Sequence, residues 1–233
     1  MPKIIWNTNI IPAENPCINS NDRGFTLGHG LFETILVNKG TIPVLNYHWQ
    51  RLETSSAMIG IPLPFTFLQL ETMIKNLIEE NHLQGKVATS RVTLTHGESE
   101  RGILPRLAPR PNFLISVFEC MPATDKPLDA LIVKTRKNEH SLSSQIKSLS
   151  YLDNILAQKE AITAGYDEAI LLNSLGNIAD GAISTIFMVK NRQIMTPGIR
   201  DGALPGVIRA VLLKELKHEF SFVEKTITPE DLM

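Results

Sequence analysis

The 233-residue sequence contains very few cysteines, and this argues against two kinds of stabilising site. Cys17 and Cys120 are its only cysteines, and neither stands in a Cys-x-x-Cys pair or beside a histidine at metal-ligand spacing. Structural zinc sites and disulfide frameworks both need such groups. We therefore expect no metal and no disulfide, and we expect a reducing compartment, the cytoplasm, as the setting.

The sequence also lacks an excess of charge of either sign. Its 23 Lys and Arg residues and 24 Asp and Glu residues give a formal net charge of −1, and the basic residues form no dense block. Nucleic acids and acidic membranes are recognised by concentrated positive charge. We expect neither as a partner, and we expect a small molecule instead.

Long hydrophobic runs and several catalytic motifs are missing as well. No apolar run approaches the roughly 18 residues of a membrane span, and residues 1–12 lack the apolar stretch and cleavage site of a signal peptide. We expect a soluble protein that is not exported. No serine or cysteine stands in a nucleophile elbow, which argues against a hydrolase. His29 and His48 have no second ligand at metal spacing, so we interpret them as structural or surface residues.

Two groups of strand and helix patterns are present, separated by a short segment with two prolines. β-Branched and aromatic runs predict strands, and apolar residues at helical spacing predict helices. In the first group we predict strands within 3–12, 31–46, 86–95 and 112–120 and helices within 46–61 and 64–82. In the second group we predict strands within 128–137, 167–173, 184–190 and 192–197, one helix after Lys147 and one within 204–220. The domains are expected at 1–119 and 127–233, with a linker at 120–126.

Two segments of the second group could carry chemistry, and each has an ordinary explanation too. Lys147, in SQIKSLSYLDN, stands just before a helical pattern. A helix N-terminus or partial burial depresses an amine pKa, as a nucleophilic lysine requires, although most lysines in such places are solvated. In DGALPGVIR, residues 201–209, two glycines before a helix could leave backbone N–H groups open to an anion, or could simply form a tight turn.

Three charged residues are further candidates. The guanidinium groups of Arg51 and Arg101 suit a phosphate or a carboxylate, but isolated arginines are mostly surface residues. Asp180, in NIADGAIS, could pair with a cationic ring nitrogen or could close an Asp-Gly turn.

Taken together, five segments follow the order and spacing of a known family. They are NDRGFTLGHGLFETI, HWQRL, IKSLSYLDNILAQKEA, DEAILLNSLGNIADGAISTIF and LPGVIR. In these segments the chain resembles the class IV, or branched-chain-type, pyridoxal-phosphate aminotransferases, and the resemblance covers about residues 3–225. It implies an α+β, fold-type IV enzyme with a small N-terminal α/β domain and a larger C-terminal domain built on a β-barrel-like sheet. It also implies a homodimer with pyridoxal 5'-phosphate between the domains.

The resemblance assigns a role to each candidate residue. Lys147 matches the lysine that anchors the cofactor covalently and acts as general acid and base, and Asp180 stands where the family carries a glutamate that pairs with the ring nitrogen. Arg51 matches the arginine that holds the cofactor phosphate. Leu204 matches the residue packed against the pyridine ring, and the backbone of Val207 and Ile208 matches the phosphate-binding turn.

Within the family, the segment THGESERGILP resembles the loop of 4-amino-4-deoxychorismate lyase, and Arg101 lies on its matching, substrate-binding arginine. That enzyme forms 4-aminobenzoate and pyruvate for folate biosynthesis. The alternative is a D-amino-acid or branched-chain aminotransferase. Ile103 replaces the histidine, and Phe32 the tyrosine, that D-amino-acid aminotransferases carry at these positions, which weakens the D-amino-acid alternative, although the segments IKSLS and DEAIL fit it well.

The sequence departs from the lyase pattern at His96, Asp180 and Thr185, where relatives carry arginine, glutamate and asparagine. Relatives also continue beyond residue 233 with strands that complete the larger domain. We therefore expect a truncated C-terminus and an incomplete second domain. A catalytically silent relative that only binds the cofactor is a further alternative.

Overall fold

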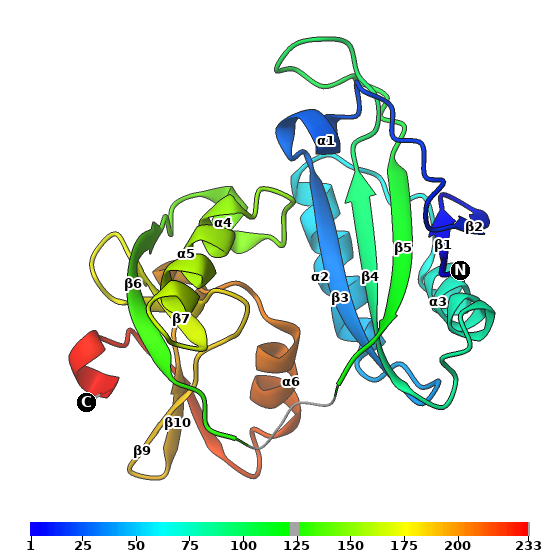
Figure 1. The fold of residues 1–233 in the computed structure, drawn as a ribbon. Coiled ribbons are helices and arrows are strands. Elements are labelled where there is room, and N and C mark those ends of the chain that lie inside the picture. Colours follow the sequence, from blue (N-terminus) through cyan, green and yellow to red (C-terminus); the bar gives the residue numbers. More distant parts are fainter. Residues whose placement is uncertain (122–125, 233) are drawn as a thin grey trace. The chain divides into compact units, whose positions relative to one another are not determined.

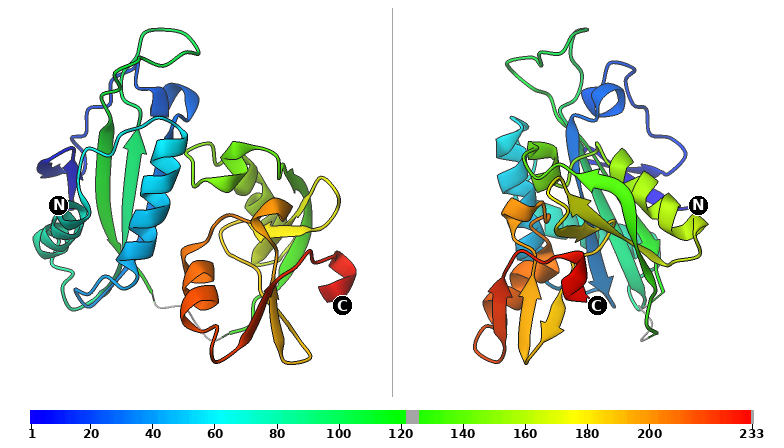
Figure 2. Two further views of the ribbon diagram at one scale, coloured as in Figure 1. Left: turned by 180° about the vertical axis from the view of Figure 1, so that it is seen from behind. Right: turned by 90° about the vertical axis from the view of Figure 1, so that its left-hand side faces the viewer.

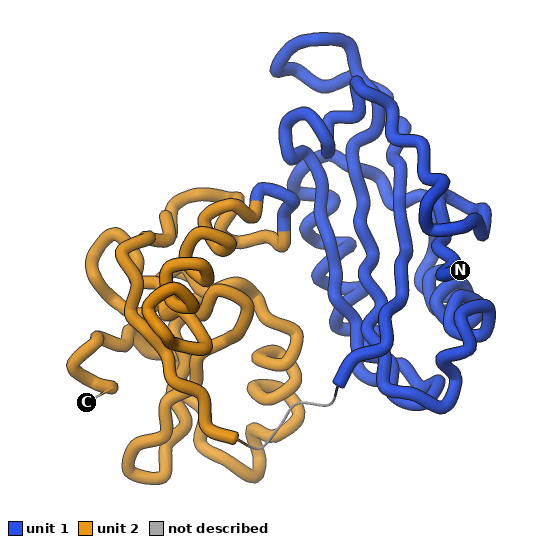
Figure 3. Tube along the Cα trace, in the orientation of Figure 1, with its two compact units in different colours: residues 1–124, 148–150 blue, residues 125–147, 151–233 orange. Residues whose placement is uncertain are grey.

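The computed structural model describes residues 1–121 and 126–232. The chain divides into two compact units, coloured separately in Figure 3. Unit 1 holds Met1–Thr124 and Ser148–Ser150, and unit 2 holds Asp125–Lys147 and Tyr151–Met233. Most of the predicted linker, residues 122–125, lies outside the described residues, so the domain boundary stays a prediction.

Unit 1 is an antiparallel sheet with two helices on one face, as Figures 1 and 2 show. The strand order is β2-β1-β5-β4-β3. The strands are β1 (Lys3–Trp6), β2 (Asn9–Pro12), β3 (Gly30–Asn38), β4 (Val87–Thr95) and β5 (Asn112–Glu119), and the helices are α1 (Arg23–Leu27), α2 (Leu45–Met58) and α3 (Phe67–Glu80). Of these helices, α2 packs on β3, and α3 packs on β1 and β5.

Local sequence explains where α3 begins and which face it buries. Thr66 and Gln69 form a capping box, in which each side chain accepts a hydrogen bond from the other residue's backbone N–H. The apolar repeat that follows packs against the sheet, and its buried members are at most 2% exposed: Leu70, Ile74, Leu77 and Ile78. The helix predicted within 64–82 is therefore confirmed.

One strand prediction in this unit is wrong. Residues 31–46 were expected to form two strands, but only β3 forms there. The chain turns at Lys39 and Gly40, which both have positive φ. Pro43 has no N–H to donate to a strand ladder, and α2 begins at Leu45 instead.

Unit 2 is built around a β–α–β crossover. The parallel strands β6 (Ala130–Lys137) and β7 (Glu168–Asn173) are joined through α5 (Leu152–Thr163), and β8 (Ile178–Gly181) pairs antiparallel with β7. A second three-stranded sheet has the order β11-β10-β9. These two sheets lie where a barrel-like sheet was expected. The remaining elements are α4 (Leu142–Gln145), β9 (Met188–Lys190), β10 (Gln193–Thr196), η1 (Ile199–Asp201), α6 (Val207–Glu215), β11 (Ser221–Glu224) and η2 (Pro229–Leu232).

Small side chains allow α5 to lie close to its sheet. Ala157 and Ala161 are fully buried against Val133, Ala169 and Leu171 of β6 and β7. This packing fixes α5, which begins at Leu152, shortly after Lys147. In the part of the chain that the structure describes, no helix has the length and apolar character needed to cross a membrane.

The burial of α3 can be tested by truncating one side chain. Leu77 is 0% exposed, so Leu77→Ala should lower the free energy of unfolding by about 2–5 kcal/mol, through lost burial and a new cavity. Leu68 on the same helix is 69% exposed, so Leu68→Ala should change it by about 0.5 kcal/mol or less. Urea unfolding measures both. Equal losses in the two variants would contradict this packing.

Candidate functional site

Asp180 lies within β8 and is buried. Its Oδ2 accepts hydrogen bonds from the Leu204 backbone N–H at 2.9 Å and from Lys137 Nζ at 3.4 Å. Its Oδ1 is buried and has no hydrogen-bond partner among the described residues. The structure therefore brings Asp180 and Leu204 together, as expected, and leaves one carboxylate oxygen unsatisfied.

The surroundings of Asp180 act on its charge in two directions. Burial raises the pKa of the Asp180 carboxyl, while the Lys137 ammonium and the Leu204 N–H oppose that rise. A cationic donor placed at Oδ1 would favour the ionised carboxylate further and would satisfy the orphaned oxygen. A protonated ring nitrogen has this chemistry.

The start of α6 has the properties of an anion seat. Gly206 is its N-cap residue and offers no side chain, so the first N–H groups of the helix, including those of Val207 and Ile208, receive no side-chain cap. A Cβ built on Gly206 would lie 2.5 Å from Thr185 Oγ1, so glycine is required for this approach. The same contact places a hydroxyl beside the seat.

Lys147 is half-buried in the segment between α4 and α5, and so differs from a fully solvated lysine. Its Nζ lies 5.2 Å from the centroid of the Tyr151 ring. Tyr151 Oη and Asn154 Nδ2 both donate to the carbonyl of Ala182, at 3.2 and 2.7 Å. The segment after Lys147 is thus tied to the residue that follows β8, the strand of Asp180.

Arg51 belongs to unit 1, where it forms a buried ion pair. Its Nε and Nη2 donate to the two oxygens of Glu33 at 2.7 and 2.6 Å, and His48 Nδ1 lies 2.7 Å from Glu33 Oε2. Burial opposes the charge of Glu33, but hydrogen bonds from Arg51 and His48 outweigh it and hold the pKa of the Glu33 carboxyl below its ordinary value of 4.5. The structural interpretation of His48 is confirmed.

Sequence reasoning missed Glu33 and Lys137 as members of these sites. A signal for Glu33 existed, because it falls in the buried part of a strand, and a carboxylate there needs a cation. Lys137 had no such signal, because 43 residues separate it from Asp180.

Arg101, the predicted substrate-binding residue, is exposed in the loop between β4 and β5 of unit 1. The other predicted residues besides Arg51 and Arg101 all belong to unit 2: Lys147, Asp180, Leu204, Val207 and Ile208.

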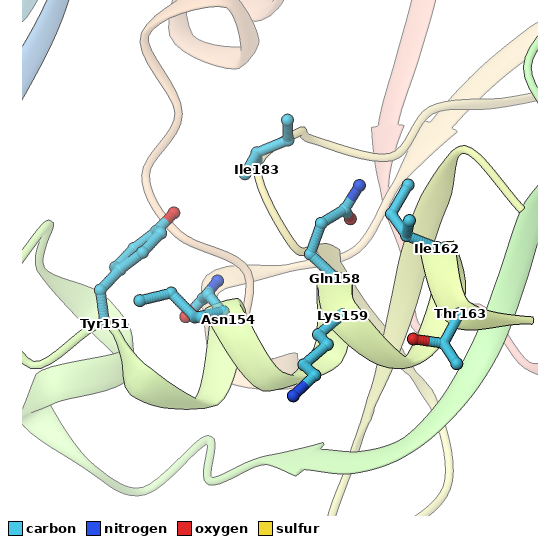
Figure 4. Close-up of a pocket in the computed structure, with 8 residues that line it drawn as sticks. Tyr151, Asn154, Gln158, Lys159, Ile162, Thr163 and Ile183 are labelled. Carbon is cyan, nitrogen blue, oxygen red and sulfur yellow. The ribbon is translucent and has the colours of Figure 1, made fainter.

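A pocket of about 370 Å³ on unit 2 is distinct from these groups. It lies along α5, where Ile162 lines it together with Ile183 from the segment after β8 (Figure 4). Ile155 of α5 also lines it. Tyr151 also lines it, but Lys147 and Asp180 do not. The pocket is therefore not the seat predicted for the cofactor.

Comparison with known sequences places the chain in the class IV amino-transferase family. The sequence model of class IV amino-transferases matches residues 30–233. The "Putative branched-chain-amino-acid aminotransferase" of Methanocaldococcus jannaschii is 30% identical over 99% of this chain and 80% of that protein. The aminodeoxychorismate lyase of Bacillus subtilis is 28% identical over 92% and 73%, and the D-alanine aminotransferase of Bacillus licheniformis is 25% identical over 99% and 81%.

Solved structures show the same fold. The branched-chain amino acid aminotransferase of Escherichia coli superposes with a TM-score of 0.90 at 24% identity, over 99% of this chain and 79% of that one. The 4-amino-4-deoxychorismate lyase of Pseudomonas aeruginosa gives 0.80 at 27% identity, over 98% and 83%. The pyridoxal-phosphate-bound form of a hypothetical aminotransferase from Mycobacterium tuberculosis gives 0.86 at 18% identity, over 99% and 83%. The predicted α+β, fold-type IV architecture is confirmed.

The residues of unit 2 fit pyridoxal phosphate. Asp180 Oδ1 lacks the partner that a protonated ring nitrogen provides, and the α6 start, kept open by Gly206, suits the phosphate. Lys147 has a half-buried amine, the kind of group with which an aldehyde reacts. Aspartate in place of the family's glutamate is thus compatible with the cofactor.

The ion pair of Glu33 should contribute stability that depends on pH. Glu33→Gln leaves the Arg51 charge without its partner, which should lower the free energy of unfolding at neutral pH by about 3–5 kcal/mol. Because the folded pKa of Glu33 is lowered, this contribution is present above the ordinary value of 4.5 and is lost as pH falls through the folded pKa. The gap between wild type and variant, measured by urea unfolding, should therefore shrink in acid.

The exposed Glu53 on α2 provides the matched control for Glu33. Glu53→Gln should change stability little at any pH. A gap for Glu33→Gln that stayed constant with pH would show that the carboxylate charge is not responsible.

The anion seat can be tested through Gly206. In Gly206→Ala the new methyl group meets Thr185 Oγ1 and displaces the start of α6, so affinity for pyridoxal phosphate should fall about tenfold or more. A methyl group at Gly85 would meet no heavy atom within 4 Å, so Gly85→Ala should bind normally. Titration of the cofactor absorbance gives both dissociation constants. Normal cofactor binding by Gly206→Ala would show that the start of α6 does not bind the phosphate.

Proposed function

The chain belongs to the class IV amino-transferase family of pyridoxal-phosphate enzymes, and from this premise we propose that it is a 4-amino-4-deoxychorismate lyase. The reaction would split its substrate into 4-aminobenzoate and pyruvate, a step of folate biosynthesis. We include a homodimer in this proposal because the family resemblance implies one. The atoms balance without a second substrate, so no amino-group acceptor is needed.

The observation that carries the proposal is the set of side chains at the predicted carboxylate-binding positions. Arg101 is present, but Ile103 and Phe32 cannot donate hydrogen bonds. Phe32 is 4% exposed, and the guanidinium carbon of Arg91 lies 3.9 Å from its ring centroid. Two donors that a D-amino-acid aminotransferase would use are therefore replaced by apolar groups, which argues against that alternative and, with the lyase-like loop THGESERGILP, supports the lyase.

The residues of this chain have separate tasks in the proposed reaction. When bound, pyridoxal phosphate supplies an electron sink for charge that develops on the substrate carbon. Asp180 would keep the ring nitrogen protonated, and the N–H groups at the start of α6 would hold the phosphate. Lys147 Nζ would move the proton at the substrate carbon, and Arg101 would bind a substrate carboxylate.

An aminotransferase is the second candidate. The 30% identity to the Methanocaldococcus jannaschii relative supports it, and so does the D-alanine aminotransferase among the relatives. Both reactions use the same cofactor and the same lysine. They differ in whether a keto acid must accept the amino group.

The proposed activity predicts that purified protein loaded with pyridoxal phosphate releases pyruvate from 4-amino-4-deoxychorismate without a keto acid. Lys147→Ala should lower this rate about a thousandfold or more, because the proton loses its carrier. Lys159→Ala, which removes an exposed lysine of α5, should leave the rate unchanged. A lactate-dehydrogenase-coupled assay measures the pyruvate that is released.

Two other results would reject the lyase, and a third would reject the role of Lys147. Turnover only after a keto acid is added would indicate the aminotransferase. Cofactor binding without turnover of either substrate would indicate a silent relative. Turnover that survives in Lys147→Ala would remove the lysine from the chemistry.

A further inference from the structure

The segment before β3 is connected to both ends of the Arg101 loop, residues 96–111 between β4 and β5. Asp22 is 0% exposed, and its Oδ2 accepts hydrogen bonds from Thr95 Oγ1 at 2.8 Å and from Asn112 Nδ2 at 2.9 Å. Thr95 ends β4 and Asn112 begins β5. Asp22 therefore fixes the two points at which the loop leaves and rejoins the sheet.

Arg23 reaches further into the same loop. It is 5% exposed, and its Nη1 and Nη2 donate to the carbonyls of Gly102 and Ile103 at 3.0 and 2.7 Å. Its backbone N–H donates to the carbonyl of Gly97 at 3.0 Å. The two carbonyls held by the guanidinium belong to the residues directly after Arg101, so the backbone that carries Arg101 is held in place.

A histidine fixes the orientation of the Arg23 guanidinium. Arg23 Nε donates to His29 Nδ1 at 3.2 Å, so this ring nitrogen is an acceptor and the proton is on Nε2. His29 Nε2 lies 3.1 Å from the carbonyl of Ile59, after the end of α2, and the His29 ring stacks on that of His96 at 4.7 Å between centroids. The planar fork of Arg23 is thus aimed at the loop by a chain of contacts that begins at α2.

The loop has little apolar anchorage in its middle part. Ile103 is 79% exposed, Leu104 is 81% exposed and Leu107 is fully exposed. A segment without buried apolar contacts opens easily, so its position depends on the polar contacts that remain. The hydrogen bonds from Arg23 come from a planar guanidinium group with five N–H donors. A lysine ammonium cannot reproduce this geometry.

We propose that Arg23 is a positioning residue for substrate recognition: it holds the Gly102 and Ile103 carbonyls and so fixes the place of Arg101. The proposal rests on the proposed function, in which Arg101 binds the substrate carboxylate. Arg23 itself touches no reacting atom. Its loss should therefore change substrate binding more than the chemical step.

The test compares the holoenzyme with Arg23→Lys, which keeps the charge and loses the fork. Trypsin cleavage after Arg101 should be about tenfold faster in the variant, because hydrogen bonds from a charged donor no longer close the loop. KM should rise about tenfold with kcat within about twofold. Arg106→Lys, at an exposed site in the same loop, keeps a trypsin site and should match the wild type in cleavage after Arg101 and in KM.

Two further measurements, on the wild type and on a second variant, test the proposal even if Arg23→Lys does not fold. In the wild type, cleavage between Arg101 and Gly102 should be slower than cleavage between Arg106 and the fully exposed Leu107. Thr95→Val removes one hydrogen bond to Asp22 and should shift cleavage and KM in the same direction by a smaller factor.

Unchanged cleavage in Arg23→Lys would overturn the proposal, whatever the activity. Faster cleavage with an unchanged KM would also overturn it, because the loop would then be held without serving the substrate. Failure of the wild type to turn over any amino substrate would instead reject the proposed function. Proteolysis would still show whether Arg23 holds the loop, so the two failures can be told apart.

Discussion

A buried carboxylate with only one satisfied oxygen is the constraint around which unit 2 is arranged. Removing a charge from water costs several kcal/mol, so Asp180 requires donors and a cation inside the protein. Lys137 and the Leu204 N–H both act on Oδ2, and Lys137 Nζ stands at 3.4 Å, near the limit of a hydrogen bond. The remaining oxygen has no partner among the described residues. The site is complete only when another donor reaches that oxygen.

Glu33 and Asp180 are both buried carboxylates, but they differ in how fully their oxygens are hydrogen-bonded. Glu33 is also buried, but Arg51 engages both of its oxygens, His48 adds a contact, and its pKa is lowered. Burial raises the pKa of Asp180, by contrast, despite Lys137. One carboxylate completes an ion pair within the protein, and the other keeps one buried oxygen without a hydrogen-bond partner among the described residues. Perturbed groups of the second kind are typical of functional sites.

Periodicity in the sequence predicted most elements of the fold, and the exceptions have physical causes. The capped apolar repeat of α3 and the alternation along β4 are local signals, and both predictions held. Residues 31–46 failed because positive φ values and Pro43 end the strand pattern early. The strand β8 was not predicted, because it is only four residues long and includes Asp180 and Gly181, residue types that are uncommon in strands.

The sequence named candidate site residues, and those assignments stay predictions, but it did not indicate the side chains that contact them. The ordered motifs pointed to Lys147, Asp180 and the turn at Leu204, and the structure brings Asp180 and Leu204 into contact. Lys137 and Arg23 were missed because each acts through contacts made only after folding. Glu33 was missed although a carboxylate in the buried part of a strand is itself a signal. For Arg23 the contacts lie 79 and 80 residues away in the chain, beyond any periodic pattern.

We propose that Lys147 is the cofactor's covalent anchor. To test this role, pyridoxal phosphate is added to the purified protein, the mixture is reduced with borohydride, and the pyridoxyl group is located by peptide mass. We expect one modified peptide, with the label on Lys147. No label at Lys147, or label scattered over exposed lysines, would contradict it.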